Sequence, residues 1–335
     1  MLNIGVIGFG YWGPNIVRNF LAIKDIKLKA ICDVNAAALN RAAALYPYIQ
    51  TFQDPQDILN SSEIDAVAII TPVSTHFSLA QQALKKGKHI FVEKPFTETT
   101  VQAQKLIDLA EKQNLMIMVD HTFIFTGAVQ KIKELIDKNA LGPLHYYDST
   151  RISLGLFQRD TNVVWDLAPH DFSIIDYLIE NKPLALTAQG QDHVGRGHEN
   201  IAYITLYYSN SLIVHINVNW LSPVKVRTTL IGGAKKMLVW DDLETDEKIK
   251  VYDRGIKVKN KESVYNLRVD YRSGDMWSPH IDPGEALKKE LAYFVECVRQ
   301  KKTPINDGQA GLRVVKMLEL VETSMKNRGK LIKCV

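Results

Sequence analysis

Three glycines near the start of the chain have the spacing of a dinucleotide-binding turn. The pattern G-x-G-x-x-G is matched by Gly8-Phe9-Gly10-Tyr11-Trp12-Gly13. Its first glycine allows a tight turn, the second lets the backbone approach a pyrophosphate, and the third permits close packing of a helix on a strand. The motif follows a strand-like run and opens a predicted helix, whose free N–H groups attract phosphates. This context predicts that all six residues contact a dinucleotide, the alternative being a glycine-rich turn without a ligand.

An acidic residue stands where such a fold holds the ribose of the cofactor. Asp33 ends the next strand-like run, 20 residues after Gly13. A carboxylate there accepts hydrogen bonds from both ribose hydroxyls, and its charge repels a 2′-phosphate. The sequence therefore predicts NAD rather than NADP. Use of both cofactors stays open, because a tenfold preference corresponds to only ~1.4 kcal/mol.

Two further groups of residues follow predicted strands, at the edge of the sheet where ligands of such folds bind. Thr71, Pro72 and His76 make up the first group; the alternative is a helix-capping turn in which Ser74 or Thr71 caps the next helix. Glu93 and Lys94 make up the second. A lysine at this edge hydrogen-bonds a substrate hydroxyl and stabilises developing alkoxide charge, whereas the plainer alternative is a surface lysine. We predict that both groups contact the cofactor, and that Lys94 also contacts the substrate.

A carboxylate and a histidine one helical turn apart form another candidate pair. Asp166 and His170 flank Pro169, ahead of an apolar run at 172–179 that is predicted to be a helix. Because proline is tolerated only in the first turn of a helix, Asp166 is expected to be the N-cap, with His170 one turn later on the same side. A carboxylate orients a histidine and raises its basicity, which suits acid-base catalysis of a bound substrate. A capping aspartate beside a partly buried histidine is equally compatible with this segment.

Three polar residues near this segment are candidates for binding substrate phosphates. They are Arg151, Arg159 and Asn162. Arginine matches phosphate geometry, although surface arginines are also common. His193 and His198-Glu199 lie in a glycine-rich turn, where the polarity of a hairpin explains them better than a metal site does. We therefore predict no metal.

The elements that position these residues change character near residue 120. Nearly continuous apolar runs, typical of strands buried on both faces, alternate with helix-like runs over the first 120 residues. The strand-like runs are Leu2–Ile7, Leu28–Cys32, Ala66–Ile70, His89–Val92 and Met116–Val119. Such a βαβα series predicts an α/β fold with a doubly wound parallel sheet, a Rossmann domain, over residues 1–120.

The second part of the chain, residues 121–335, has mostly a period of two. In Leu212–Trp220 apolar residues alternate with His215, Asn217 and Asn219, as expected of a half-buried antiparallel strand. Residues 254–284 have little periodicity and are expected to form a long irregular excursion before two closing helices. We predict an α+β domain for substrate binding and oligomerisation, built on a mainly antiparallel sheet with one open face.

Aromatic residues of these strands favour a subunit interface. Tyr203, Tyr207 and Trp220 would place apolar surface on the sheet, which predicts a homodimer or homotetramer formed through it.

Length and composition exclude several classes of protein. The 335 residues suggest about two domains, and the net charge of +4 without a basic stripe disfavours nucleic acid as a partner. No apolar run reaches the ~18 residues that span a bilayer. The N-terminus lacks the features of a signal peptide, and the three cysteines are too few for a disulfide framework. We therefore expect a soluble, cytoplasmic protein without membrane partners.

Several of these motifs together resemble the glucose-fructose oxidoreductase/inositol dehydrogenase (Gfo/Idh/MocA) family. The segments that carry the resemblance are Ile7–Asn15, Glu93-Lys94-Pro95, Asp166-Leu167-Ala168-Pro169-His170 and Pro304–Gly308. The resemblance covers essentially the whole chain. It implies that Lys94 is a catalytic lysine and that His170 is an acid-base histidine supported by Asp166. It also implies an NAD-dependent dehydrogenase acting on a CH–OH group.

Within that family, the first and third segments look most like nucleotide-sugar dehydrogenases. Those enzymes oxidise a ring hydroxyl, typically C3 of a UDP-N-acetyl sugar such as UDP-N-acetylglucosamine. The resemblance therefore implies a nucleotide-sugar substrate. Many relatives have glycine two residues before the histidine, where this chain has Ala168, and this departure weakens inferences from inositol-type members. The alternatives are a dehydrogenase of a free sugar or cyclitol, and a non-catalytic NAD-dependent regulator.

Overall fold

The chain folds into two compact units. A computed structural model describes residues 1–155, 161–258 and 269–334. Unit 1 comprises residues 1–125 and 284–316, and unit 2 comprises residues 126–283 and 317–335. The sequence predicted a single boundary at residue 120 and did not predict that residues 284–316 belong to the first unit. In unit 1, Arg18 pairs with Glu285 through two hydrogen bonds of 3.1 and 2.6 Å.

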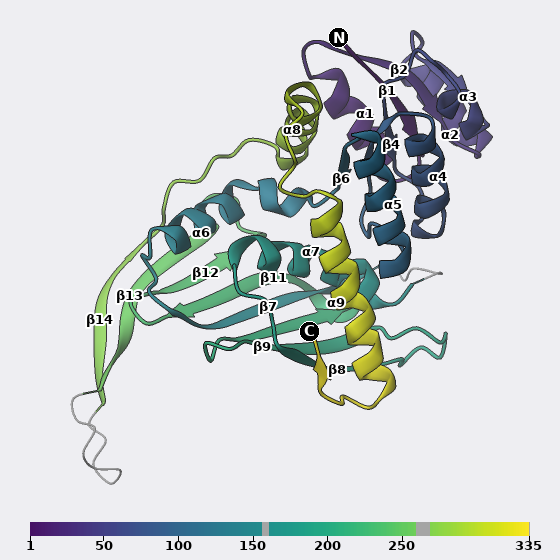
Figure 1. The fold of residues 1–335 in the computed structure, drawn as a ribbon. Helices are drawn as coiled ribbons and strands as arrows, with labels where there is room; N and C mark the ends of the chain where they lie inside the picture. The colour runs from purple at the N-terminus through teal and green to yellow at the C-terminus, as the bar shows by residue number, and fades with distance from the viewer. Residues whose placement is uncertain (156–160, 259–268, 335) are drawn as a thin grey trace. The chain divides into compact units, whose positions relative to one another are not determined.

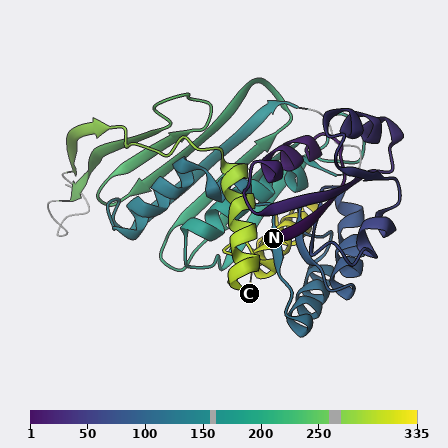
Figure 2. The same cartoon turned by 90° about the horizontal axis from the view of Figure 1, so that it is seen from above.

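Unit 1 is built on a six-stranded parallel sheet in the order β3-β2-β1-β4-β5-β6 (Figures 1 and 2). Its strands are β1 (Leu2–Ile7), β2 (Ile26–Cys32), β3 (Gln50–Phe52), β4 (Ala66–Ile69), β5 (His89–Val92) and β6 (Ile117–Val119). Its helices are α1 (Gly13–Leu21), α2 (Ala36–Leu45), α3 (Pro55–Leu59), α4 (Val73–Lys85), α5 (Thr100–Gln113) and α8 (Ala286–Gln300). All four residues of β4 are buried, as expected of a strand covered on both faces. The prediction of a doubly wound parallel sheet is confirmed.

Unit 2 is built on a nine-stranded, mainly antiparallel sheet in the order β14-β13-β12-β11-β7-β10-β9-β8-β15. Its strands are β7 (Leu144–Leu154), β8 (Ala185–Gln191), β9 (Ile201–Tyr207), β10 (Ile213–Asn219), β11 (Leu221–Gly233), β12 (Met237–Asp241), β13 (Ile249–Val258), β14 (Val269–Trp277) and β15 (Ile332–Lys333). Its helices are α6 (Gly127–Asp137) and α7 (Val163–Leu178), while α9 (Gly308–Lys326) contributes residues to both units. Strands β7 and β10 form a parallel pair within this sheet.

The two faces of this sheet differ in burial, as the alternating pattern predicted. Val214, Ile216 and Val218 of β10 are fully buried, whereas Ile213 and Tyr203 remain 44% and 48% exposed. Helix α7 packs against β9 and β10, and α6 lies beside α7 (Figure 1). The mainly antiparallel sheet is thereby confirmed.

The predicted irregular excursion at 254–284 was wrong in part. Strands β13 and β14 form an antiparallel pair at one end of the sheet, and Arg272 and Asp253 form an ion pair of 3.0 Å across it. Of the two, β14 is the edge strand of the sheet, and edge strands commonly carry charged residues. Its sequence therefore lacks the period-two signal on which the prediction depended.

None of the helices in the described ranges is long and apolar enough to span a membrane.

Candidate functional site

The outer two glycines of the G-x-G-x-x-G turn are required by the packing of unit 1 itself. Gly8 has a φ of +105°, and a Cβ there would lie 2.1 Å from the carbonyl oxygen of Ile70. A Cβ on Gly13 would lie 2.5 Å from the carbonyl oxygen of Gly8. The turn therefore passes directly over the end of β4 and into α1, where no side chain fits.

Gly10 is the exception, because its environment leaves room for a ligand. No atom lies within 4 Å of the position that a Cβ would take, and the residue is exposed. Helix α1 begins at Gly13 after the N-cap Trp12, whose side chain makes no capping hydrogen bond. The N-terminus of a helix and the open space above the middle glycine fit the pyrophosphate of a dinucleotide.

Asp33 is held beside this turn with both of its carboxylate oxygens oriented. The N–H of Phe9 donates to Oδ2 at 2.6 Å, and the N–H of Asn35 donates to Oδ1 at 2.8 Å. A carboxylate offers about four acceptor positions, so two remain for the hydroxyls of a ribose. The ring of Phe9 is fully buried, which leaves only its backbone available to a ligand, whereas the side chain of Tyr11 is 90% exposed.

Replacing Asp33 by serine is expected to relax the preference for NADH over NADPH. The change removes the charge that repels a 2′-phosphate, and Arg41, which donates to the carbonyl of Phe9 at 3.0 Å, supplies a cation nearby. We expect the ratio of the NADPH and NADH dissociation constants to fall by about tenfold or more, equivalent to ~1.4 kcal/mol. Titration of both cofactors measures it. Asp54→Ser, at the N-cap of α3, is the control, and an unchanged ratio in Asp33→Ser contradicts the assignment.

His76 joins the two turns that follow β4 and β5. It is fully buried, and its ring nitrogens lie 2.7 Å from the carbonyl oxygen of Thr71 and 2.9 Å from that of Pro95. Burial lowers the pKa of His76, although both carbonyls oppose this effect. This placement supports a role in positioning the two turns, while direct contact of His76 with a cofactor stays a prediction.

The remaining residues of these turns lie at the carboxyl edge of the sheet. The N–H of Glu93 donates to the carbonyl of Ile69 at 2.9 Å, so Glu93 and Lys94, both half-buried, directly follow the β4–β5 pair. The alternative of a side-chain cap on α4 by Thr71 or Ser74 was wrong. Its N-cap is Pro72 without a side-chain hydrogen bond.

In unit 2, helix α7 begins earlier than predicted and carries Asp166 and His170 in its interior. Its N-cap is Asn162, whose Oδ1 accepts from the N–H groups of Val164 and Trp165, both at 3.1 Å. The prediction of Asp166 as N-cap was therefore wrong. Pro169 lies inside the helix, where it removes one backbone hydrogen bond, and the buried packing of α7 compensates for this loss. The pair still lies one turn apart on the same side.

Trp220 orients the Asp166 carboxylate, and sequence reasoning missed this contact. The indole Nε1 donates to Oδ2 of Asp166 at 3.2 Å. The backbone of Trp220 is held on both sides, by the carbonyl of Asn200 at 2.9 Å and the N–H of Gly155 at 3.2 Å. Trp220 is 2% exposed, so its predicted place on an interface was wrong. The only feature of the sequence that pointed to a role for Trp220 was its position at the end of an alternating strand.

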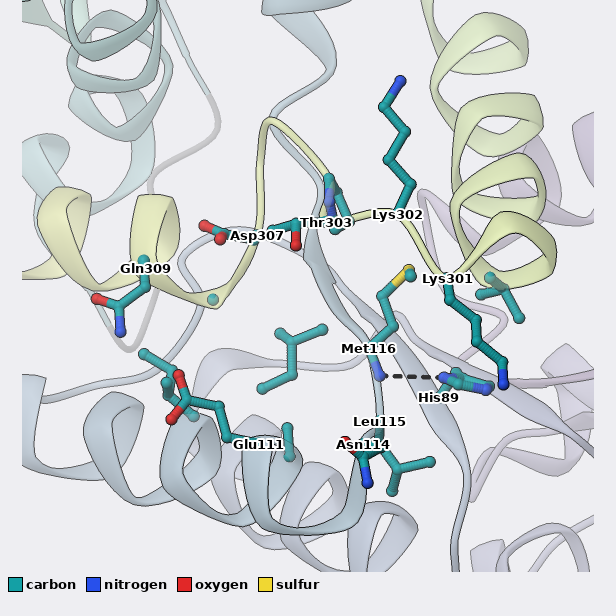
Figure 3. A pocket seen from close by; sticks show the side chains of 16 residues that line it. His89, Glu111, Asn114, Leu115, Met116, Lys301, Lys302, Thr303, Asp307 and Gln309 are labelled. Carbon is teal, nitrogen blue, oxygen red and sulfur yellow. Dashed lines mark hydrogen bonds between the residues drawn. The ribbon is translucent and has the colours of Figure 1, made fainter.

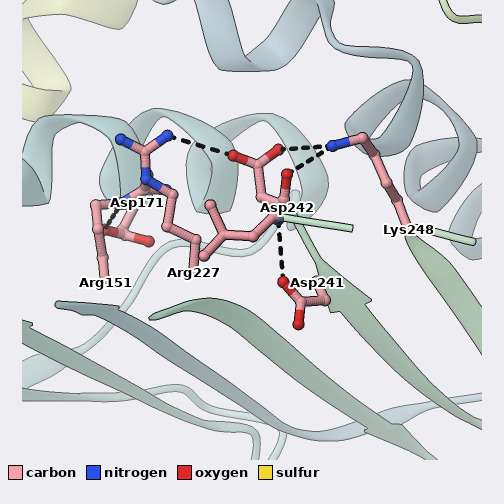
Figure 4. Close-up of polar contacts among 7 residues, drawn as sticks. Arg151, Asp171, Arg227, Asp241, Asp242 and Lys248 are labelled. Atoms are coloured by element: carbon pink, nitrogen blue, oxygen red, sulfur yellow. Dashed lines mark hydrogen bonds and ion pairs between the residues drawn. The ribbon is translucent and has the colours of Figure 1, made fainter. Parts of the chain in front are cut away.

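A buried ion pair fixes α7 to the sheet next to His170. Arg151 of β7 is 6% exposed, and its Nε donates to Oδ2 of Asp171 at 3.0 Å. Figure 4 shows Arg151 beside Asp171. The hydroxyl of Ser149 donates to the other oxygen of Asp171 at 2.6 Å. Because Asp171 directly follows His170, this network sets the orientation of the helix that carries the histidine. Contact of Arg151 with a substrate phosphate stays a prediction.

The other predicted phosphate-binding residues are placed differently. The side-chain amide of Asn162 also donates to Glu199 at 2.9 Å, and Arg159 lies outside the described residues. Arg227 stands opposite Arg151 across the β7–β11 pair and lies 3.5 Å from Asp242 (Figure 4). It is a cation that sequence reasoning did not single out.

The glycine-rich turn that contains His193 and His198 is organised by a carboxylate. Asp192 accepts hydrogen bonds from the N–H groups of Val194, Gly195 and Gly197 at 2.9, 2.8 and 2.7 Å. Among the described residues there is no cluster of histidine, cysteine and acidic side chains that would hold a metal ion.

A cavity of about 420 Å³ in unit 1 lies at the opposite, amino edge of the parallel sheet (Figure 3). It is lined by the starts of β5 and β6, the end of α5 and the segment that joins α8 to α9. His89 lines it and accepts a hydrogen bond from the N–H of Met116 at 3.0 Å; burial lowers the pKa of this histidine. The cavity therefore does not coincide with the residues singled out for chemistry.

Comparison with known protein families assigns both parts of the chain. A model described as an oxidoreductase family with an NAD-binding Rossmann fold matches residues 2–121. A model of the GFO/IDH/MocA C-terminal domain matches residues 129–239. The glycine-rich turn, the open space at Gly10 and Asp33 fit this cofactor, so unit 1 contains an NAD-binding Rossmann domain.

Individual relatives cover almost the whole chain at low identity. The UDP-N-acetylglucosamine 3-dehydrogenase of Acidithiobacillus ferrooxidans is 27% identical over 317 residues, covering 94% of each chain. Its solved structure superposes with a TM-score of 0.79 over 97% of this chain and 98% of that one, at 25% identity. The scyllo-inositol 2-dehydrogenase of Bacillus subtilis is 24% identical, covering 91% of this chain and 87% of its own. Levoglucosan dehydrogenase in complex with NADH and L-sorbose shares the fold, with a TM-score of 0.84 at 17% identity over 100% of this chain and 99% of that one.

Proposed function

Because the chain belongs to the Gfo/Idh/MocA family of NAD-dependent oxidoreductases, we propose that it moves a hydride between a ring carbinol of a nucleotide sugar and the nicotinamide. The carbinol we propose is C3 of a UDP-N-acetylglucosamine-type sugar. The observation that carries the dehydrogenase assignment is the Asp166–His170 pair on α7, with Trp220 holding the carboxylate. The substrate class rests on similarity to a UDP-N-acetylglucosamine 3-dehydrogenase over 94% of both chains.

The proposed mechanism divides one oxidation among three side chains. A ring nitrogen of His170 removes the proton of the substrate hydroxyl, and Asp166 stabilises the resulting imidazolium. Lys94 donates a hydrogen bond to the same oxygen, which lowers the pKa of the hydroxyl and stabilises the alkoxide. As the C–O bond becomes a carbonyl, the carbon loses its hydride, and bound NAD supplies the acceptor. Residues 8–13 and Asp33 would hold this cofactor through its pyrophosphate and ribose.

A free sugar or cyclitol is the second candidate substrate, and one observation favours it. Arg151 and Asn162, the predicted phosphate contacts within the described chain, are already engaged by Asp171 and Glu199. A substrate without phosphates needs neither residue. A non-catalytic NAD-dependent regulator is the third hypothesis, but it gives no reason for the combination of Lys94, Asp166 and His170.

The first experiment is to measure thermal unfolding of the purified protein with NADH and a panel of UDP-sugars, free sugars and inositols. A ligand that binds the native state raises the unfolding midpoint by mass action, independently of an unfavourable oxidation equilibrium. We expect a shift with UDP-N-acetyl sugars and none with free polyols. The opposite pattern overturns the nucleotide-sugar proposal and favours the cyclitol alternative.

We further propose that the protein is cytoplasmic and forms a homodimer or homotetramer through the open face of the unit 2 sheet. Tyr203 and Tyr207 on that face are 48% and 37% exposed, which supports an interface there. Light scattering on the sample used for unfolding gives the mass in solution. A monomer at micromolar concentration would contradict the assembly.

A further inference from the structure

A buried polar cluster lies at the carboxyl edge of the unit 1 sheet, and the proposed mechanism does not use it. Its members are Asp120, just after β6, Glu290 of α8, and Asn306, just before α9. They are 3%, 0% and 0% exposed. Two acidic side chains this deeply buried are costly unless hydrogen bonds or a shared proton compensate.

Asp120 connects the glycine-rich turn to the strand ends. Its Oδ2 accepts a hydrogen bond from the indole Nε1 of Trp12 at 3.3 Å, and its Oδ1 accepts a hydrogen bond from the hydroxyl of Thr122. The backbone N–H of Asp120 donates to the carbonyl of Val92, the last residue of β5, at 2.7 Å. One carboxylate therefore holds a side chain of residues 8–13 against the end of the sheet.

Glu290 is placed to donate a proton to this carboxylate. Its Oε1 accepts from the amide of Asn306 at 2.9 Å, and the same amide donates to the carbonyl of Val119 at 2.7 Å. Its Oε2 is buried and accepts no hydrogen bond among the described residues, and the side chains of Thr122 and Asp120 lie beside its carboxyl group. Burial, and then the neighbouring Asp120, raise the pKa of Glu290 well above its usual range. When it is protonated, Glu290 donates a hydrogen bond to Asp120, which gives both buried carboxyl groups a hydrogen-bond partner.

We propose that Asp120 and Glu290 are positioning residues for cofactor binding. The proton of Glu290 and the indole N–H of Trp12 together hold the Asp120 carboxylate, which fixes the glycine-rich turn in the conformation that receives the pyrophosphate. The inference rests on the proposed contact of residues 8–13 with NAD and is independent of the substrate. Asp120 and Glu290 are not catalytic residues, because they act through Trp12.

The charges around Glu290 determine the direction of the pH effect. Among the described residues, the ionisable groups whose charge acts on Glu290 are Asp120 at the end of β6 and Glu93 at the end of β5, while its polar neighbours Thr122 and Asn306 are neutral. Loss of the Glu290 proton at high pH thus places a further negative charge among carboxylates. The repulsion weakens the hold of Asp120 on Trp12, so cofactor affinity falls as the pH rises.

The experiment measures the dissociation constant of NADH from mildly acidic to alkaline pH in the full-length wild type and in Glu290→Gln. Glutamine keeps an N–H donor for Asp120 and a carbonyl acceptor for Asn306, but its side chain does not titrate. We expect the wild-type dissociation constant to rise by about tenfold or more across the range and that of Glu290→Gln to stay flat. Equal pH profiles overturn the proposal.

A second variant keeps the proposal testable if Glu290→Gln does not fold. Trp12→Phe keeps an aromatic ring and removes the indole N–H, so its NADH dissociation constant should rise by about tenfold. Trp165→Phe is the matched control, because it removes an indole–carboxylate hydrogen bond of 2.7 Å to Glu322 in unit 2. A Trp12→Phe variant that binds like the control contradicts the proposal. If the nucleotide-sugar proposal is wrong, the unfolding experiment shows different ligands stabilising the protein, but the NADH dissociation constants of these variants are not affected.

Discussion

Replacement of His170 by alanine is expected to lower kcat by about 10²–10⁴-fold, the usual contribution of a positioned acid-base group. The variant loses the group that accepts the substrate proton, while residues 8–13 and Asp33 still bind the cofactor. The dissociation constant of NADH should therefore stay within about twofold of the wild-type value. Turnover is followed by the formation of NADH, and binding is measured by titration.

Two further variants test whether the effect belongs to the Asp166–His170 pair. Trp220→Phe removes the donor that orients Asp166, and a lost hydrogen bond to a charged group lowers kcat by about tenfold or more. His193→Ala changes a histidine of the Asp192 turn and should leave kcat unchanged. If His170→Ala and Lys94→Ala both retain full function, the dehydrogenase mechanism is wrong and the regulator hypothesis gains support.

Gly8→Ala should lower stability and Gly10→Ala should lower cofactor affinity, although the two residues share one turn. Gly8→Ala is expected to destabilise the apoprotein by about 3 kcal/mol or more, because its Cβ would lie 2.1 Å from a backbone oxygen at a φ of +105°. Gly10→Ala should leave apoprotein stability unchanged, since no atom lies within 4 Å of its Cβ position. It should weaken NADH binding about 100-fold, or ~2.7 kcal/mol, by filling the space for the pyrophosphate. Chemical denaturation and cofactor titration separate the two effects.

Gly87 provides the control for backbone conformation alone. It follows α4 with a φ of +75° and has nothing within 4 Å of a Cβ position, so Gly87→Ala should cost only about 1 kcal/mol. The amount by which Gly8→Ala lowers the free energy of unfolding more than Gly87→Ala does then measures the clash with Ile70. Wild-type affinity of Gly10→Ala for NADH would place the pyrophosphate elsewhere.

Local signals predicted much of unit 1 because its chemistry is carried by short segments. The glycine-rich turn, the acid at the end of β2 and the strand at 89–92 each depend on neighbouring residues, and the structure has them at the predicted places. The cap of α3 by Asp54 and the positive φ of Gly87 follow from the same local rules. In such segments backbone geometry and hydrogen bonding are settled within a few residues.

Prediction failed where a distant partner outweighs a local preference. The proline rule placed the start of α7 too late, because it ignores how burial against a sheet compensates for one missing hydrogen bond. Residues 254–284 are polar with little periodicity, although β13 and β14 extend into this range. No local signal indicates that residues 284–316 return to unit 1.

The sequence by itself determined the family, the two kinds of sheet, the cofactor and a dehydrogenase chemistry, because these follow from motifs whose residues act within a few positions of one another. Only the tertiary structure decided that Trp220 holds Asp166, that Asp171 pairs with Arg151, and that Asp120 accepts a hydrogen bond from Trp12. These contacts join residues that lie between 20 and 108 positions apart in the sequence. Burial and hydrogen bonding at such separations depend on how the chain packs, and no spacing along the sequence encodes them.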